Sequence, residues 1–160
     1  MTRTFLHYIL GLVFITSLVS CDKNLVFEDN KEIKDNNWDQ ANKLAFSVAI
    51  TDSTAPHSIY LNVRNAGWYT FSNLFIFVHT TLPDGSITAD TAECVLADEN
   101  GKWLGDGLGD IYDNRILFKK QFRFPQVGIY KFELEQAMRV NPLPGIMDAG
   151  MRIEREEASK

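Results

Sequence analysis

The residue with the best-defined chemistry in this sequence is Cys21, which ends the segment LVSC at 18–21. An aliphatic residue, two small or medium-sized residues and a cysteine form the pattern at which bacterial lipoprotein precursors are acylated and cleaved. Arg3 and an apolar run at 5–19 precede it, as in an export signal. That run is shorter than the ~20 residues that a membrane-spanning helix needs. We therefore predict a signal peptide at 1–20 and a lipid anchor on Cys21, with acyl chains such as palmitate.

A second group of residues suited to recognition lies in the glycine-rich segment at 98–115. Four glycines between residues 101 and 109 exclude a regular helix or strand there. We expect an ordered loop whose apolar side chains at 103, 104, 108, 111 and 112 pack inward. Aromatic residues and arginine dominate the binding energy of protein interfaces. The candidate partner-binding residues are accordingly Trp103, Asp110, Tyr112, Asp113 and Arg115. The alternative is that this loop only closes the fold.

Catalytic and metal-binding patterns are missing from the sequence. His57 and His79 are the only histidines after the signal, and their spacing does not match a zinc motif. No Gly-x-Ser-x-Gly elbow is present. The acidic residues at 106–113 lack the spacing of a calcium loop, and we expect Asp110 or Asp113 to pair with Arg115 or to cap a turn. We predict a protein that is not an enzyme and has no cofactor or metal.

The charge and the cysteines exclude further classes of protein. The formal net charge is −5, and removal of Arg3 with the signal makes it one unit more negative. This sign argues against nucleic acid as a partner and against a polybasic membrane patch. Cys94 is the only other cysteine and lies in a strand-like run. Because Cys21 would carry lipid, we expect no internal disulfide and a buried, unreactive thiol at Cys94.

Alternating apolar and polar residues predict an all-β fold. The segments with this period-two pattern, separated by turn signals, are 44–50, 59–64, 74–79, part of 86–97, 116–124, 130–138 and 149–153. Because 74–79 is apolar on both faces, we expect it to be central in its sheet. About seven to eight strands without an amphipathic helix indicate an antiparallel β-sandwich. The predicted divisions are a polar tether at 21–40, a sandwich domain at 41–153 and a polar tail at 154–160.

One local motif narrows the type of sandwich. Tyr130 stands in Gly-Ile-Tyr-Lys-Phe at 128–132, shortly after Pro125. This context resembles the tyrosine corner of immunoglobulin-like domains, in which the tyrosine hydroxyl bonds back to the preceding connection. We therefore predict an immunoglobulin-like sandwich, with a jelly roll as the alternative topology.

The same segments carry a family resemblance that extends over nearly the whole chain after the signal. The sequence is similar to the gliding motility lipoprotein GldH family in the short motifs at 38–39, 60–65, 101–105, 110–115, 135–139 and 142–146. The resemblance implies a noncatalytic lipoprotein of the cell envelope that gliding motility requires. It also implies association with the type IX secretion and gliding machinery, with a lipid-anchored domain facing the periplasm. It implies no binding residues that could be carried over.

Two other functions follow from the residues themselves. The aromatic cluster of Trp68, Tyr69 and Phe71 suggests an envelope glycan-binding module, because exposed rings stack on sugars. Carboxylates at Glu93, Asp110 or Asp113 could serve an envelope hydrolase, but two acids in a loop are a weak signal.

Overall fold

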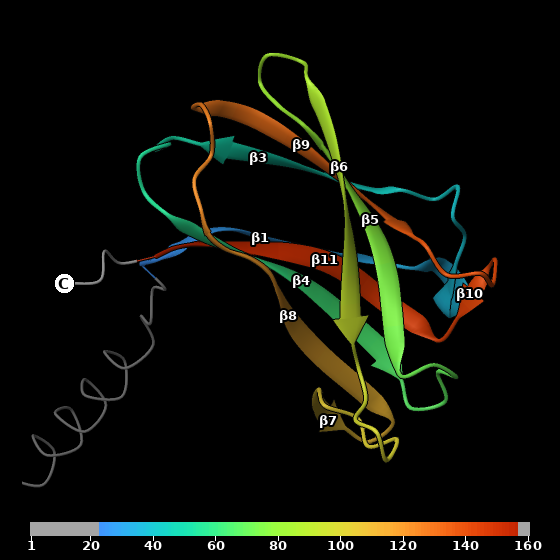
Figure 1. Ribbon diagram of the computed structural model, residues 1–160. Helices are drawn as coiled ribbons and strands as arrows, with labels where there is room; N and C mark the ends of the chain where they lie inside the picture. The colour runs from blue at the N-terminus through green and yellow to red at the C-terminus, as the bar shows by residue number, and fades with distance from the viewer. Residues whose placement is uncertain (1–22, 157–160) are drawn as a thin grey trace, which may run out of the picture.

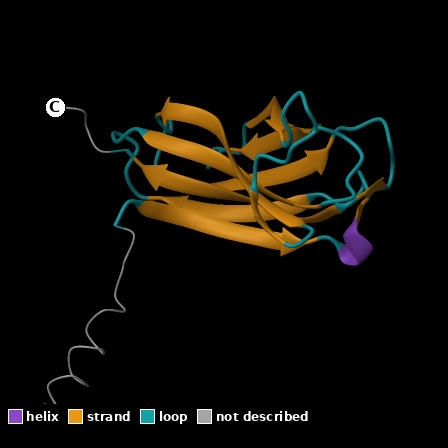
Figure 2. Ribbon diagram, turned by 90° about the horizontal axis from the view of Figure 1, so that it is seen from below, coloured by secondary structure: helices purple, strands orange, loops and turns teal. Residues whose placement is uncertain are grey.

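A computed structural model describes residues 23–156, which form two antiparallel sheets packed face to face (Figure 1; Figure 2). Cys21 and the predicted signal peptide lie outside the described residues. The elements in chain order are β1 (Leu25–Glu32), the 3-10 helix η2 (Lys34–Asn36), β2 (Asn37–Trp38), β3 (Leu44–Ile50), β4 (His57–Ala66), β5 (Asn73–Thr81), β6 (Ile87–Val95), β7 (Asp106–Leu108), β8 (Ile111–Phe122), β9 (Gly128–Gln136), β10 (Leu143–Pro144) and β11 (Ile146–Arg155).

The strand order places segments far apart in the sequence side by side. One sheet has five strands in the order β1-β11-β4-β8-β7, and the other has four in the order β3-β9-β5-β6. The two-residue strands β2 and β10 form a small separate ladder at one end. The prediction of an antiparallel β-sandwich is confirmed, and every predicted strand corresponds to an observed one. β8 begins at Ile111, inside the segment predicted to be a loop, and β5 is an inner strand as expected.

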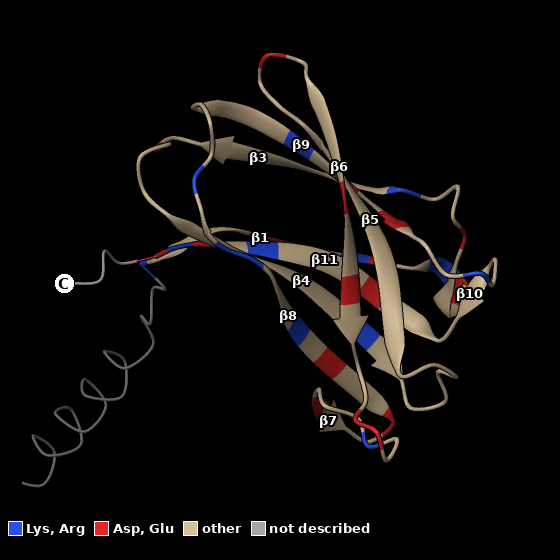
Figure 3. Ribbon diagram, in the orientation of Figure 1, with Lys and Arg blue, Asp and Glu red and all other residues tan. Residues whose placement is uncertain are grey.

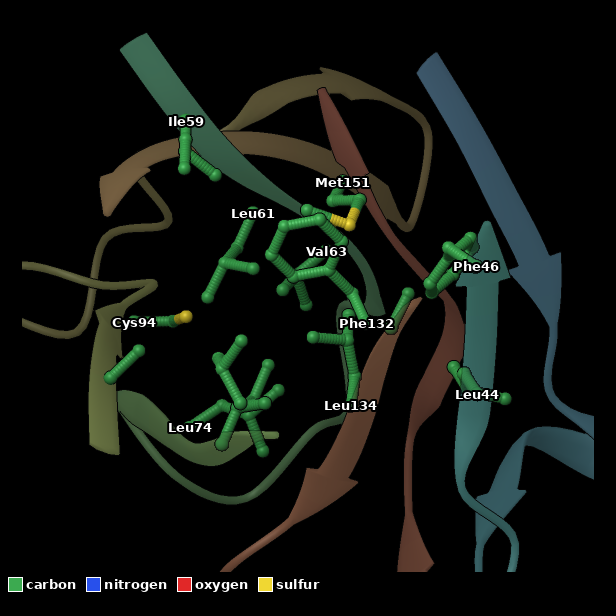
Figure 4. Packing of buried hydrophobic residues seen from close by; sticks show 14 of the residues in the cluster. Leu44, Phe46, Ile59, Leu61, Val63, Leu74, Cys94, Phe132, Leu134 and Met151 are labelled. Carbon is green, nitrogen blue, oxygen red and sulfur yellow. The ribbon is translucent and has the colours of Figure 1, made fainter. Parts of the chain in front are cut away.

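The core lies between the two sheets and is built by side chains at alternate positions. In β3, Leu44, Phe46, Val48 and Ile50 are buried, while the residues between them are half-buried or exposed. β4 contributes Ile59, Leu61 and Val63 from the opposite sheet (Figure 4). Successive strand residues point to opposite faces, so one face of each sheet is apolar. Cys94 is part of this core, and burial raises the pKa of its thiol to about 12, which keeps the thiol protonated and unreactive.

The tyrosine corner contact is present. The Tyr130 hydroxyl donates to the carbonyl oxygen of Gln126 at 2.8 Å, and the backbone N–H of Gln126 lies 3.3 Å from that hydroxyl oxygen. The ring itself is buried and packs on Phe124 and Phe132. This bond fixes the path of the connection between β8 and β9.

The prediction of a solvated tether at 21–40 is wrong for most of that segment. β1 pairs with β11 from Leu25↔Glu154 to Glu32↔Asp148, and it forms one edge of the five-stranded sheet. Ile33 and Trp38 are buried in the core. The polar composition suggested a tether because β1 is an edge strand, whose side chains are nearly all exposed. The C-terminal tail is likewise shorter than predicted, since β11 continues to Arg155.

Gly150 is the position in β11 that permits this pairing. A Cβ there would lie 2.2 Å from both the side-chain oxygen of Asn30 and the backbone oxygen of Asp29 in β1. We expect Gly150→Ala to displace β1 and to lower the free energy of unfolding by about 1–3 kcal/mol. Chemical denaturation monitored by tryptophan fluorescence measures the change. Gly67→Ala is the matched control, because a Cβ there meets its neighbours at ordinary distances of 3.4 Å or more. Equal stability of the two variants would contradict the tight β1–β11 contact.

Candidate functional site

The predicted partner-binding residues fall on two different faces of β8. Tyr112 and Asn114 point toward the space between the sheets, whereas Asp113 and Arg115 point outward. This separation follows from the alternation of side chains along a strand. Asp110 lies just before the strand and is exposed, and its backbone carbonyl accepts a hydrogen bond from the N–H of Gly67 at 2.6 Å. The five candidates therefore do not form one surface.

Trp103 and Tyr112 belong to the inner group, where they pack on each other. Their ring centroids are 5.6 Å apart, and Trp103 also lies 6.4 Å from the ring of buried Tyr69. Both rings are half-buried. This arrangement supports the alternative that these two aromatic residues close the end of the sandwich. Leu104 and Leu108 do not pack inward as predicted: they are 58% and 89% exposed.

On the outer face, Arg64 of β4 joins two carboxylates from neighbouring strands. Its Nε lies 2.6 Å from Oδ1 of Asp113 on β8, and its Nη1 lies 3.0 Å from Oδ2 of Asp148 on β11. The register places these three residues opposite one another, and Asp106 of β7 extends the row next to Asp113. The hydrogen bond that Arg64 donates to Asp113 is the main cause that raises the pKa of Arg64. Figure 3 shows acidic and basic segments next to each other on β8.

A second polar row crosses the sheet beside the first. The register aligns Asn30, Gly150, Asn62 and Arg115 across β1, β11, β4 and β8. The Asn62 side-chain nitrogen donates to Oδ1 of Asn30 at 3.0 Å and to Oε1 of Glu28 at 3.1 Å. Since Gly150 has no side chain, the two asparagines can meet above the sheet at this point.

Glu28 links the second row to a buried arginine. Its Oε1 lies 3.3 Å from Nη2 of Arg115, and its other oxygen accepts a hydrogen bond from Nη1 of Arg152. Arg152 is 7% exposed and also donates to Glu154. Burial by itself lowers the pKa of Arg152. Its hydrogen bonds to Glu154 and Glu28 outweigh that effect and raise the pKa above its usual value, so this arginine stays charged. A buried charge held by two carboxylates fixes the position of Glu28.

Together these residues form a polar groove on the outer face of the five-stranded sheet. It has a volume of about 430 Å³ and contains four carboxylates and two guanidinium groups. The residues that line it are Glu28, Asn30, Asn62, Val63, Arg64, Asp106, Asp113, Asn114, Arg115 and Asp148. We call it the polar groove. Its ion pairs are exposed, so each adds only ~0–1 kcal/mol to stability.

Sequence reasoning found Asp113 and Arg115 but paired them incorrectly. Within one strand, residues two positions apart lie on the same face but ~7 Å from each other, so a cross-strand neighbour is the closer partner. Asp113 therefore pairs with Arg64, and Arg115 with Glu28. Arg64 carried a signal, because it lies on the outward face of a predicted strand. Glu28 lies in the segment predicted to be a tether, and Asp148 lies just before the last predicted strand, so neither was predicted as a site residue.

The structure does not form the predicted platform of three aromatic rings. Trp68 is 57% exposed, but Tyr69 is buried and Phe71 packs against the core with its ring 5.6 Å from that of Tyr69. The polar groove has no aromatic side chain among its described lining residues. Within this aromatic cluster, Trp68 alone has a ring exposed enough to stack on a sugar.

Two further properties concern the described residues as a set. Within 23–156, no three His, Cys, Asp or Glu side chains come close enough together to hold a metal ion. No helix in this part of the chain has the length and apolarity to cross a bilayer.

Comparison with known proteins gives matches that cover nearly the whole chain. Residues 25–153 match the family model described as GldH lipoprotein. A protein of Christiangramia forsetii named gliding motility lipoprotein GldH homolog is 34% identical over 155 residues, which cover 91% of this chain and 94% of that protein. The gliding motility lipoprotein GldH of Flavobacterium johnsoniae is 33% identical over 156 residues, covering 92% of this chain and 96% of the relative. No solved structure matches the chain. The matched segment begins with β1 and ends within β11, and the chain belongs to the GldH lipoprotein family.

Proposed function

We propose that this protein is a noncatalytic lipoprotein of the cell envelope that supports gliding motility through contacts with the type IX secretion and gliding machinery. Its relatives are named for gliding motility and for a lipid anchor. The LVSC segment at 18–21 supplies the acylation site, Cys21, ahead of the folded domain. Envelope attachment through that lipid follows from the same assignment.

The observation that carries the proposal is the polar groove. Arg64 and Arg115 are held in place by carboxylates of neighbouring strands, yet both guanidinium groups are about half exposed. Preorganised arginines on a rigid sheet favour binding, because little side-chain entropy is lost when a partner docks. Since Trp103 and Tyr112 pack within the domain, the groove replaces the 98–115 loop as the main partner surface. Asp113 and Arg115 remain in the proposed site.

The same contacts argue against catalysis in the groove. Asp113 and Asp148 share Arg64, and Glu28 is held by Arg115 and Arg152. A general acid or base needs a carboxylate that is poised to exchange a proton, usually in a desolvated or like-charged setting. Carboxylates that neutralise arginines instead form a surface for electrostatic complementarity. We therefore assign the groove to protein recognition.

Crosslinking in living cells tests this assignment. Tyr60 borders the groove, with its neighbours Arg152 and Leu117 on the adjacent strands. A photoreactive phenylalanine analogue at position 60 should capture a component of the gliding or secretion machinery in motile cells. The matched control is the same analogue at Phe77, which is exposed on the outer face of the opposite sheet. Capture of the same proteins from both positions, or none from position 60, contradicts the proposal.

A further inference from the structure

The first described residues are held tightly to one end of the sandwich. The carbonyl oxygen of Asn24 accepts a hydrogen bond from the backbone N–H of Arg155 at 2.8 Å, and β1 begins at the next residue. Only three residue steps separate Cys21 from Asn24. An extended chain spans at most ~3.6 Å per residue, so these steps cover no more than ~11 Å. Covalent geometry alone therefore limits the separation of Cys21 and Asn24 to ~11 Å between their Cα atoms.

The connections that gather at this end can be identified from their contacts. Arg155 reaches Asp52 in the β3–β4 connection at 2.6 Å, and the N–H of Glu156 bonds to the carbonyl oxygen of Pro56 at 2.8 Å. Arg123, which follows β8, donates to the carbonyl oxygen of Thr54. In Figure 1 the two ends of the described chain, the β3–β4 connection and the β8–β9 connection all lie at the left. The segment at 98–110, which contains β7, lies at the other end.

Two apolar side chains, two positions apart in the sequence, are exposed near this end. Val127 is 56% exposed and Ile129 is 60% exposed, in and just after the connection that the Tyr130 corner fixes. Exposure alone does not identify a lipid contact, because Leu104 and Leu108 are exposed at the opposite end. The two ends differ because only the end with Val127 and Ile129 lies within reach of the lipid proposed on Cys21. The lipid headgroup region is only ~5–8 Å deep on each side of the hydrocarbon core, so a domain tethered within ~11 Å meets it.

We infer that the end of the sandwich formed by the 51–56 and 123–129 segments rests on the lipid surface, with Val127 and Ile129 inserted among the headgroups. The inference rests on the proposed lipid anchor at Cys21. It fixes the orientation in which the proposed function operates. β4 has ten residues and spans ~33 Å, so the opposite end of the domain stands about that far above the headgroups. The polar groove lies along the side of the sheet and stays open to a partner above the membrane.

A fluorescent reporter at each end of the domain tests this orientation. The full-length acylated protein is reconstituted into phosphatidylethanolamine and phosphatidylglycerol vesicles, with Val127→Cys or Leu108→Cys labelled by an environment-sensitive dye. Cys94 is buried and does not compete for the label, and Cys21 carries the lipid. We expect a several-fold rise in fluorescence and strong quenching by brominated acyl chains at position 127, with neither effect at 108. Unfolding curves of both labelled proteins confirm that each is folded.

The possible outcomes distinguish failure of the inferred orientation from failure of the proposed lipid anchor. If the protein floats with the vesicles but position 127 stays in water, or if 108 is quenched instead, the orientation is wrong while the anchor stands. If the wild type and Cys21→Ser both fail to float, the anchor is absent and both proposals fall. Flotation of the wild type alone, with quenching confined to position 127, supports both.

Discussion

Replacing Trp38 with alanine should lower the free energy of unfolding by about 3–5 kcal/mol. The indole is completely buried, and its Nε1 donates to the carbonyl oxygen of Asn42 at 3.0 Å. Trp38 also pairs with Leu143 in the ladder of β2 and β10, and Gln136 donates to its carbonyl oxygen. The substitution would leave a large cavity at the point where the N-terminal segment crosses from one sheet to the other. Equilibrium denaturation in urea measures the loss.

The chain offers a matched control for this substitution. Trp68 is 57% exposed at the surface. Trp68→Ala should change the free energy of unfolding by no more than ~0.5 kcal/mol, because surface substitutions away from packed features have small effects. A similar loss in both variants would mean that Trp38 does not have the packing role that its burial indicates.

Replacing both groove arginines, in the double variant Arg64→Gln with Arg115→Gln, should abolish colony spreading. Arginines at the centre of an interface commonly contribute about 2 kcal/mol or more each, and ~2 kcal/mol already corresponds to a roughly thirty-fold weaker affinity. The fold should tolerate the change, because exposed ion pairs contribute only ~0–1 kcal/mol to stability. Colony spreading is measured beside immunoblots of protein abundance, since loss of the protein itself would also stop spreading.

The control for the groove variant must change the net charge by the same amount at residues outside the groove. Lys131→Gln with Arg139→Gln removes two positive charges from exposed residues that do not line the groove. This variant should spread like the wild type. Normal spreading of the groove variant at normal abundance would exclude the groove as the functional surface. Failure of both variants would point to overall charge as the cause.

Most of the sheet structure could be predicted because the relevant signal is local. The alternation of apolar residues at 44–50 and 59–64 matches β3 and β4 closely. The Tyr130 motif predicted a hydrogen bond to the preceding connection, and this bond is present. β1 was missed because an edge strand with an exposed surface has no apolar alternation. Its position depends on the pairing with β11, more than a hundred residues later in the chain.

The candidate site was predicted only in part, for a related reason. Asp113 and Arg115 were among the predicted candidates and both line the polar groove, but their ion-pair partners Arg64 and Glu28 come from distant strands. Trp103 and Tyr112 looked equivalent to them in sequence, yet the pleat of β8 turns Tyr112 inward onto Trp103. A glycine-rich segment likewise did not reveal where β8 begins.

The amino-acid sequence alone was sufficient to predict the all-β class, the positions of most strands and the family. These features depend on residue types and spacings within short segments. The polar groove and the pairing of β1 with β11 required the folded chain. They arise from the register between strands that are remote in sequence, and that register is set by packing of the whole sandwich.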